Sequence, residues 1–88
     1  MALKKYTIYS TPVCHYCHLL KNWLTENNVP FTEKDVAKDL SARQEMVAKS
    51  HQMGVPVSVI ELDGGDGKTK EKIVTGFDQM KLSRLLDL

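Results

Sequence analysis

Two thiols, Cys14 and Cys17, are separated by two residues and are the only cysteines in the 88-residue sequence. A thiolate attacks disulfide bonds, and two thiols at this spacing can close into a disulfide of their own. The surrounding residues 11–18 read TPVCHYCH, where a strand-like run gives way to a helical pattern. We expect Cys14, at the helix start, to be the nucleophile, because helix N-terminal N–H groups stabilise a thiolate. Cys17, one turn further on, is expected to be better shielded and to attack a mixed disulfide formed on Cys14.

The elements around the dithiol are predicted to be a strand, a helix and a second strand. Residues 5–10 are rich in β-branched and aromatic side chains, which favours a strand that ends at Thr11-Pro12. Apolar residues then recur at three- and four-residue steps, which predicts an amphipathic helix from Cys14 to about residue 28. Its apolar stripe would consist of Tyr16, Leu19, Leu20, Trp23 and Leu24. Residues 31–36 alternate like a half-buried strand, and a connection through one helix implies that the two strands are parallel.

A second helix is predicted over residues 40–50, with Asp39 or Ser41 as its cap. Its thin apolar face would consist of Leu40, Met46 and Val47. Pro56 stands directly before the strongest run of β-forming residues and lacks an N–H group for the sheet. We therefore expect Pro56 to be the first residue of a strand that reaches residue 60.

The C-terminal third is predicted to be a hairpin strand followed by a helix. Residues 63–67, rich in Gly and Asp, form the expected turn to an antiparallel strand over 71–75. Gly76 ends that strand, and Asp78 can cap a last helix. The buried face of that helix would consist of Leu82, Leu85 and Leu86.

Composition limits the classes of function. The length fits one domain, residues 1–88, with a modest core. The formal net charge of +1 gives no field that would attract nucleic acid or an anionic membrane, so neither is an expected partner. No apolar run approaches the length of a membrane span and no signal peptide is evident, so we expect a cytoplasmic protein. In a reducing compartment, two cysteines are expected to be catalytic or metal-binding rather than a structural disulfide.

The order of elements, with a dithiol at the first strand-to-helix turn, resembles the glutaredoxin branch of the thioredoxin fold. The features that carry this resemblance are the motif Cys14-His15-Tyr16-Cys17, similar to the Cys-Pro-Tyr-Cys of glutaredoxins, the pair Val55-Pro56, the turn Gly76-Phe77-Asp78 and the small size. The resemblance implies an α/β fold with a four-stranded mixed sheet flanked by helices. It also implies a thiol–disulfide oxidoreductase that reduces protein or mixed disulfides.

The same resemblance implies which residues form the site. The counterpart of Pro56 in that family is a cis-proline beside the dithiol, and the residue before it offers backbone groups to a bound thiol peptide. The catalytic residues would be Cys14 and Cys17, with no metal and no tightly bound cofactor. The residues that bind the substrate or thiol peptide would be Thr11, Pro12, His15, Tyr16, Val55, Pro56, Gly76, Phe77 and Asp78.

Two departures from the family bear on the reductant. Many glutaredoxins that use glutathione carry a lysine three residues before the first cysteine, where this chain has Thr11. Many also have Gly-Gly before the last helix, whereas Gly76-Phe77 is similar to NrdH-type redoxins, which take electrons from thioredoxin reductase. Glutathione as a co-substrate and thioredoxin reductase both stay open as electron sources for a disulfide-containing protein substrate.

His15 replaces the proline usual in the family. An imidazolium next to Cys14 would favour the reduced form and make the disulfide more oxidising. Alternatively, His15 is a solvent-exposed side chain that is largely uncharged near neutral pH.

Three other readings of the motif are open. Residues 14–18 fit the haem-attachment pattern C-x-x-C-H, with His18 as the axial ligand. The two cysteines could join a zinc site or a glutathione-assisted iron–sulfur cluster between subunits, although both neighbouring histidines would not reach the same centre. A binding module could keep the fold and hold a peptide or metal in the groove at Val55-Pro56. The small, charge-balanced chain is expected to be a monomer.

Overall fold

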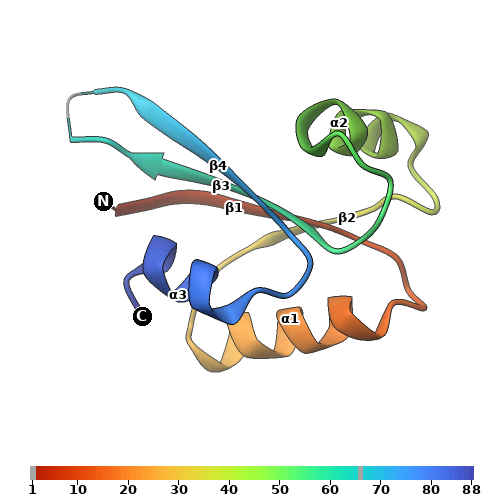
Figure 1. Cartoon of the computed structure of the whole chain (residues 1–88), viewed down its shortest axis with the longest axis horizontal. Helices are drawn as coiled ribbons and strands as arrows, with labels where there is room; N and C mark the ends of the chain where they lie inside the picture. The colour runs from red at the N-terminus through yellow and green to blue at the C-terminus, as the bar shows by residue number, and fades with distance from the viewer. Residues whose placement is uncertain (1, 66) are drawn as a thin grey trace.

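The computed structural model describes residues 2–65 and 67–88. Along the chain it contains β1 (Ala2–Ser10), α1 (His15–Glu26), β2 (Thr32–Asp35), α2 (Leu40–Ser50), β3 (Val57–Asp63), β4 (Thr69–Thr75) and α3 (Gln79–Leu86). The four strands form one sheet in the order β2-β1-β3-β4 (Figure 1). Strand β1 is parallel to β2 and antiparallel to β3, and β3 is antiparallel to β4. The predicted order of elements and the mixed sheet are confirmed.

Helices cover both faces of the sheet, with α1 and α3 on one side and α2 on the other (Figure 1). Alternate residues of a strand point to opposite faces, and β1 divides its side chains accordingly. Tyr6 and Ile8 pack in the larger core with α1 and α3, whereas Tyr9 packs with α2. Residues 6–10 of β1, which lead into the dithiol turn, are therefore buried on both faces of the sheet.

Helix α1 confirms part of the predicted apolar stripe, since Leu20 and Leu24 are buried and Trp23 packs partly buried against the core. Cys17 is the third buried residue of the helix. Tyr16 is 62% exposed and Leu19 is 38% exposed, so their inclusion in the stripe was wrong. The row of residues that faces the sheet includes Cys17, because a thiol is buried as readily as a small apolar group. The neighbouring residues Tyr16 and Leu19 therefore lie on the sides of the helix.

Helix α2 confirms one predicted cap and corrects the apolar face. Asp39 is the N-cap, and its carboxylate accepts a hydrogen bond from the backbone N–H of Ala42 at 3.1 Å. Ala42 and Met46 are buried, but Leu40 is 66% exposed because it lies in the first turn, away from the sheet.

The strands are longer or shorter than expected at their ends. Strand β1 begins at Ala2 rather than at residue 5, and β2 is confined to Thr32–Asp35. The hairpin extends further, since β3 reaches Asp63 and β4 begins at Thr69. Asp66 of the predicted turn lies outside the described residues. Pro56 stands immediately before β3 rather than within it.

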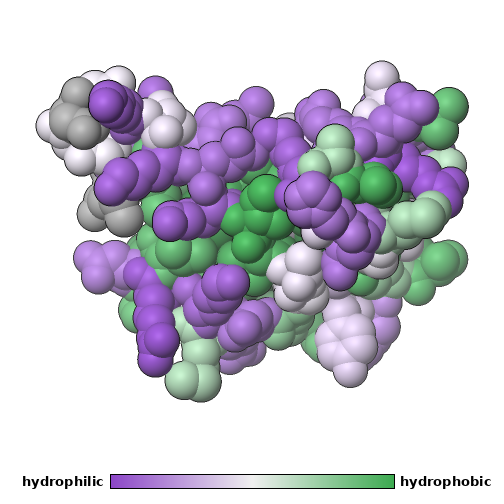
Figure 2. Space-filling model, turned by 45° about the horizontal axis from the view of Figure 1, so that its top comes forward, coloured by the Kyte–Doolittle hydropathy of each residue, from purple (hydrophilic) through white to green (hydrophobic). Residues whose placement is uncertain are grey.

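Helix α3 begins where predicted, with Asp78 as N-cap and Leu82 buried. Gly76, between β4 and the cap, has a φ of 75°, a conformation that favours glycine. No helix among the described residues is long and apolar enough to cross a membrane. On the face in Figure 2, hydrophilic side chains predominate and apolar ones reach the surface in patches between them.

Candidate dithiol site

The turn between β1 and α1 carries Cys14. The backbone N–H of Cys14 donates to the carbonyl of Thr11 at 3.3 Å, which closes the turn. Cys14 is the N-cap of α1, and its Sγ accepts a hydrogen bond from the backbone N–H of Cys17 at 3.2 Å. A side chain at this position receives a backbone donor that has no partner within the helix, and negative charge is favoured there. The sulfur of Cys14 is thus placed where a thiolate is stabilised.

The two thiols differ in accessibility. Cys14 is partly exposed, whereas Cys17 is fully buried. Burial raises the pKa of Cys17 to about 12, and its hydrogen bond with Cys14 adds to the rise. The backbone of Thr11 and the charge of Lys21 act in the opposite direction. A substrate disulfide can therefore reach Cys14 first, while Cys17 is held as a thiol behind it.

The segment before β3 lies against the dithiol. The Val55–Pro56 peptide bond is cis. The Cys14 thiol donates to the carbonyl of Val55, with 3.8 Å between Sγ and O. On the other side, the backbone N–H of Gly76 donates to the carbonyl of Pro56 at 2.8 Å. Figure 1 shows the connection from α2 to β3 passing beside the turn from β4 to α3. The Val55-Pro56 segment thus connects the dithiol turn on one side with the turn at Gly76 on the other.

His15 and Tyr16 lie on the solvent side of the site. Both are exposed, and their rings meet edge to face with 5.8 Å between centroids. Val13, just before Cys14, is 93% exposed, and Met53, two residues before Val55, is 59% exposed. Apolar and aromatic groups therefore flank the two segments that bear Cys14 and Val55.

His18 is exposed, as expected for the helix flank, but it also has a partner. Its Nε2 lies 2.9 Å from the carbonyl oxygen of Pro12. This contact ties the first turn of α1 back to the dithiol turn. Within residues 2–65 and 67–88, no group of three or more His, Cys, Asp or Glu side chains could hold a metal ion.

Phe77 and Asp78 are placed mainly by packing and capping. The Phe77 ring meets Trp23 of α1 edge to face, with 6.0 Å between centroids, and is partly buried. The Asp78 carboxylate accepts a hydrogen bond from the backbone N–H of Lys81 at 3.1 Å. The turn at Gly76 is therefore fixed against α1 and α3 beside Pro56.

A polar cavity on the flank of α1 was not predicted. It has a volume of about 310 Å³ and is lined by Ser10, Pro12, His18, Lys21, Glu33 and Asp35. Ser10 and Lys21 both donate to the same oxygen of Glu33, at 2.6 and 2.7 Å. The sequence features that could have indicated this cavity are the polar residues at the ends of two neighbouring parallel strands and the lysine four residues after Cys17.

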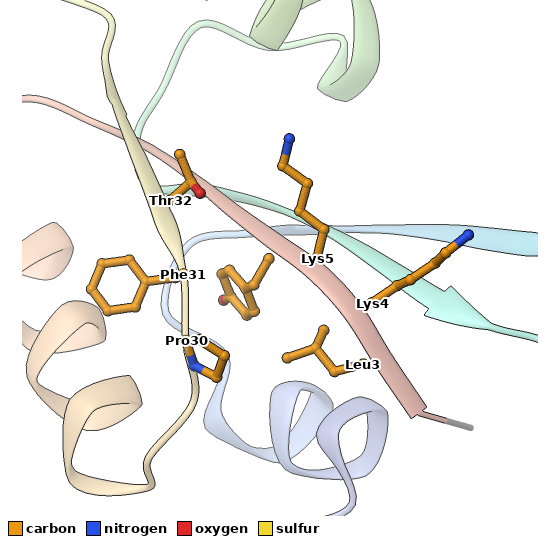
Figure 3. Close-up of a pocket in the computed structure, with 7 residues that line it drawn as sticks. Leu3, Lys4, Lys5, Pro30, Phe31 and Thr32 are labelled. Atoms are coloured by element: carbon orange, nitrogen blue, oxygen red, sulfur yellow. The ribbon is translucent and has the colours of Figure 1, made fainter.

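A second hollow lies toward the opposite end of β1 (Figure 3). It is lined by Leu3, Lys4, Lys5, Tyr6, Pro30, Phe31 and Thr32. None of these residues carries a thiol, an imidazole or a carboxylate, so this hollow has no group suited to disulfide chemistry.

Comparisons with known proteins agree with this geometry. A sequence model of the glutaredoxin family matches residues 6–64. The chain is 38% identical over 80 residues to an uncharacterised glutaredoxin-like 8.6 kDa protein of the rubredoxin operon of Clostridium pasteurianum, across 91% of this chain and 95% of that protein.

Solved structures show the same fold. The crystal structure of the thioredoxin-like protein BC3987 is similar with a TM-score of 0.75 and 35% identity, across 93% of this chain and 100% of its own. The glutaredoxin of Archaeoglobus fulgidus has a TM-score of 0.75 at 20% identity, across 93% of this chain and 85% of its own, which is a likeness of fold. The predicted thioredoxin fold is confirmed.

Proposed function

This chain belongs to the glutaredoxin family, and from that premise we propose that it is a thiol–disulfide oxidoreductase that uses Cys14 and Cys17 as a reversible dithiol. The observation that carries the proposal is the arrangement of the two thiols. An accessible sulfur caps α1, and a buried thiol lies one turn behind it, with its backbone N–H directed at that sulfur. Membership of the family supports a redox role in general, and this arrangement supports Cys14 as the first nucleophile and Cys17 as the second.

In the first half-reaction, the thiolate of Cys14 attacks a disulfide of the substrate. A bond forms between the Cys14 sulfur and one substrate sulfur, and the other substrate sulfur leaves as a thiolate and takes up a proton. The N-terminal amide groups of α1 stabilise negative charge at Cys14 before the attack. The carbonyl of Val55, at 3.8 Å from the Cys14 sulfur, lies where the backbone of an extended substrate can pass.

In the second half-reaction, Cys17 attacks the sulfur of Cys14. The Cys14–Cys17 disulfide forms, the bond from Cys14 to the substrate breaks, and the reduced substrate leaves. A reductant then restores both thiols. The dithiol turn and the Val55-Pro56 segment are bordered by exposed side chains and by a turn. We assign to contacts with substrate or reductant the exposed residues Pro12, His15 and Tyr16 and the turn Gly76-Phe77-Asp78.

The reductant is tested by steady-state reduction of a disulfide in two parallel systems coupled to NADPH. One system contains thioredoxin reductase, and the other contains glutathione and glutathione reductase. Turnover with glutathione alone would show that Thr11 is tolerated in place of the family's lysine. Turnover with thioredoxin reductase alone would support the similarity of Gly76-Phe77 to the NrdH-type redoxins. Activity in neither system would contradict the proposed function and favour a binding module on the same fold.

A further inference from the structure

The polar cavity places a lysine on the same face of α1 as the buried thiol. Residues four positions apart on a helix lie one above the other, and Lys21 follows Cys17 by four residues. Lys21 is partly buried and lines the cavity together with Ser10, the last residue of β1. Its positive charge acts on Cys17 in the direction that favours the thiolate.

Lys21 is held in this position by an ion pair. Its Nζ donates to Oε2 of Glu33 at 2.7 Å, and the buried Ser10 hydroxyl donates to the same oxygen at 2.6 Å. These hydrogen bonds keep the pKa of Glu33 below its usual value, so the carboxylate stays ionised. Glu33 therefore fixes the ammonium group beside α1 and also offsets part of its charge.

We propose that Lys21 is a positioning residue for the second half-reaction, in which its charge stabilises the attacking thiolate of Cys17, and that Glu33 moderates this effect. The inference rests on the proposed oxidoreductase function. In this step Cys17 loses its proton, its sulfur bonds to the sulfur of Cys14, and the bond between Cys14 and the substrate sulfur breaks. The substrate sulfur leaves with the electron pair and takes up a proton, so no further oxidant or reductant is needed.

Other charged groups around Cys17 have defined positions. Cys14 lies at the cap of the same helix, and a thiolate there raises the pKa of Cys17. His18 and Asp35 line the polar cavity, and His18 acts on Glu33. The backbone of Thr11 also favours ionisation of Cys17, and it is unchanged in a Lys21 variant. Because Lys21 lies one turn from Cys17 on the same helix and is fixed there by Glu33, its removal should act on the second half-reaction.

The two half-reactions can be observed separately with dithiobis(nitrobenzoate). Attack by Cys14 releases one coloured thiolate in a phase whose rate depends on reagent concentration. Attack by Cys17 releases the second in a phase that does not. Stopped-flow absorbance across a pH series would give both rates for the wild type and for Lys21→Met, Lys21→Arg, Glu33→Gln and Lys34→Met. Lys34→Met is a matched control, because Lys34 forms an ion pair of 2.8 Å with Glu45 on the opposite face of the sheet.

Lys21→Met should slow the second phase about twofold to threefold near neutral pH, because a tenfold change would need a full pKa unit and the lysine charge is the smallest of the influences on Cys17. Its pH profile should move to higher pH, and Lys21→Arg should restore the wild-type profile. Glu33→Gln should speed the second phase and move the profile to lower pH, because the carboxylate no longer offsets the lysine. Lys34→Met should leave both phases unchanged.

Two results would overturn the inference. Equal second-phase rates in Lys21→Met and the wild type would show that the lysine does not act on Cys17. Slowing by Glu33→Gln would show that the ion pair only supports the structure. A missing first phase in the wild type would instead overturn the proposed function itself, so the two failures are distinguishable.

Discussion

The backbone N–H of Cys17 donates a hydrogen bond to the sulfur of Cys14 at 3.2 Å, and that sulfur is also the N-cap of α1. The Cys14 side chain therefore caps α1 by accepting a hydrogen bond from a backbone N–H group that has no partner within the helix. A cap must be an acceptor, and a thiolate is a better acceptor than a thiol. The first turn of α1 thus directs a backbone donor at the sulfur that we propose as the nucleophile, while Cys17 lies behind it, out of contact with solvent.

His15, the first residue of α1, is predicted to make the disulfide more oxidising. A positive charge beside Cys14 stabilises the reduced, thiolate form. Replacing His15 with Pro or with Gln should therefore lower the reduction potential of the Cys14–Cys17 pair. Equilibration with a glutathione redox buffer measures this. The Gln variant shows the effect of losing the charge without the effect of Pro on the backbone. An unchanged reduction potential in both variants would show that His15 does not act on the dithiol.

Asp78 is predicted to support the site as well as the helix. Removing its cap with Asp78→Ala should cost about 1 kcal/mol of stability, as caps generally do. It should also raise the KM for a disulfide substrate, because the cap fixes the turn at Gly76 that is bonded to Pro56. Asp39→Ala is the matched control, since Asp39 caps α2 in the same way. Urea unfolding and steady-state kinetics would distinguish them, and an equal KM in both variants would confine Asp78 to stability.

Much of this architecture was predictable because it depends on local signals. The caps at Asp39 and Asp78 and the strand-like run before Cys14 each depend on a few neighbouring residues, and the structure confirms each of them, whereas Pro56 lies one residue before the strand that it was predicted to begin. Tyr16, Leu19 and Leu40 were misplaced because helical spacing alone does not show which of two adjacent rows faces the sheet. These residues were assigned to the core because they are hydrophobic. In α1, the row of residues that faces the sheet contains Cys17 instead.

The polar cavity was missed for a different reason. Ser10, Lys21 and Glu33 come from β1, α1 and β2, so their contact depends on the parallel register of the strands. Each residue alone fits a solvated surface. Only the pairing of Ser10 with Asp35 and of Ile8 with Glu33 brings the carboxylate under α1.

Tyr6 is predicted to make the fold sensitive to alkali. It is buried, it shares a hydrogen bond with Ser58, and burial raises its pKa to about 12 from an ordinary value of 10.0. In the unfolded chain the phenol ionises first. The stabilisation is therefore present below about pH 10 and is lost as the pH rises toward 12, to the extent of about 2 to 3 kcal/mol.

Tyr6→Phe checks this expectation. Near neutral pH the variant should be less stable by about 1 kcal/mol, because the hydrogen bond to Ser58 is lost. Its stability should fall less steeply above pH 10, although Tyr9, whose pKa is also raised by burial, keeps part of the dependence. Urea unfolding followed by circular dichroism across the alkaline range gives both quantities. Parallel curves for variant and wild type would contradict the assignment.

The assignment of the two thiols is tested most directly by trapping the mixed disulfide. Cys14→Ser and Cys17→Ser variants would be incubated with a disulfide substrate and analysed by intact-protein mass spectrometry. The structure predicts a stable adduct on Cys14 in Cys17→Ser, since the second thiol that would release it is gone. It predicts no adduct and no turnover in Cys14→Ser, because Cys17 is buried. An adduct on Cys17 in Cys14→Ser, with none in Cys17→Ser, would contradict the proposed order of attack.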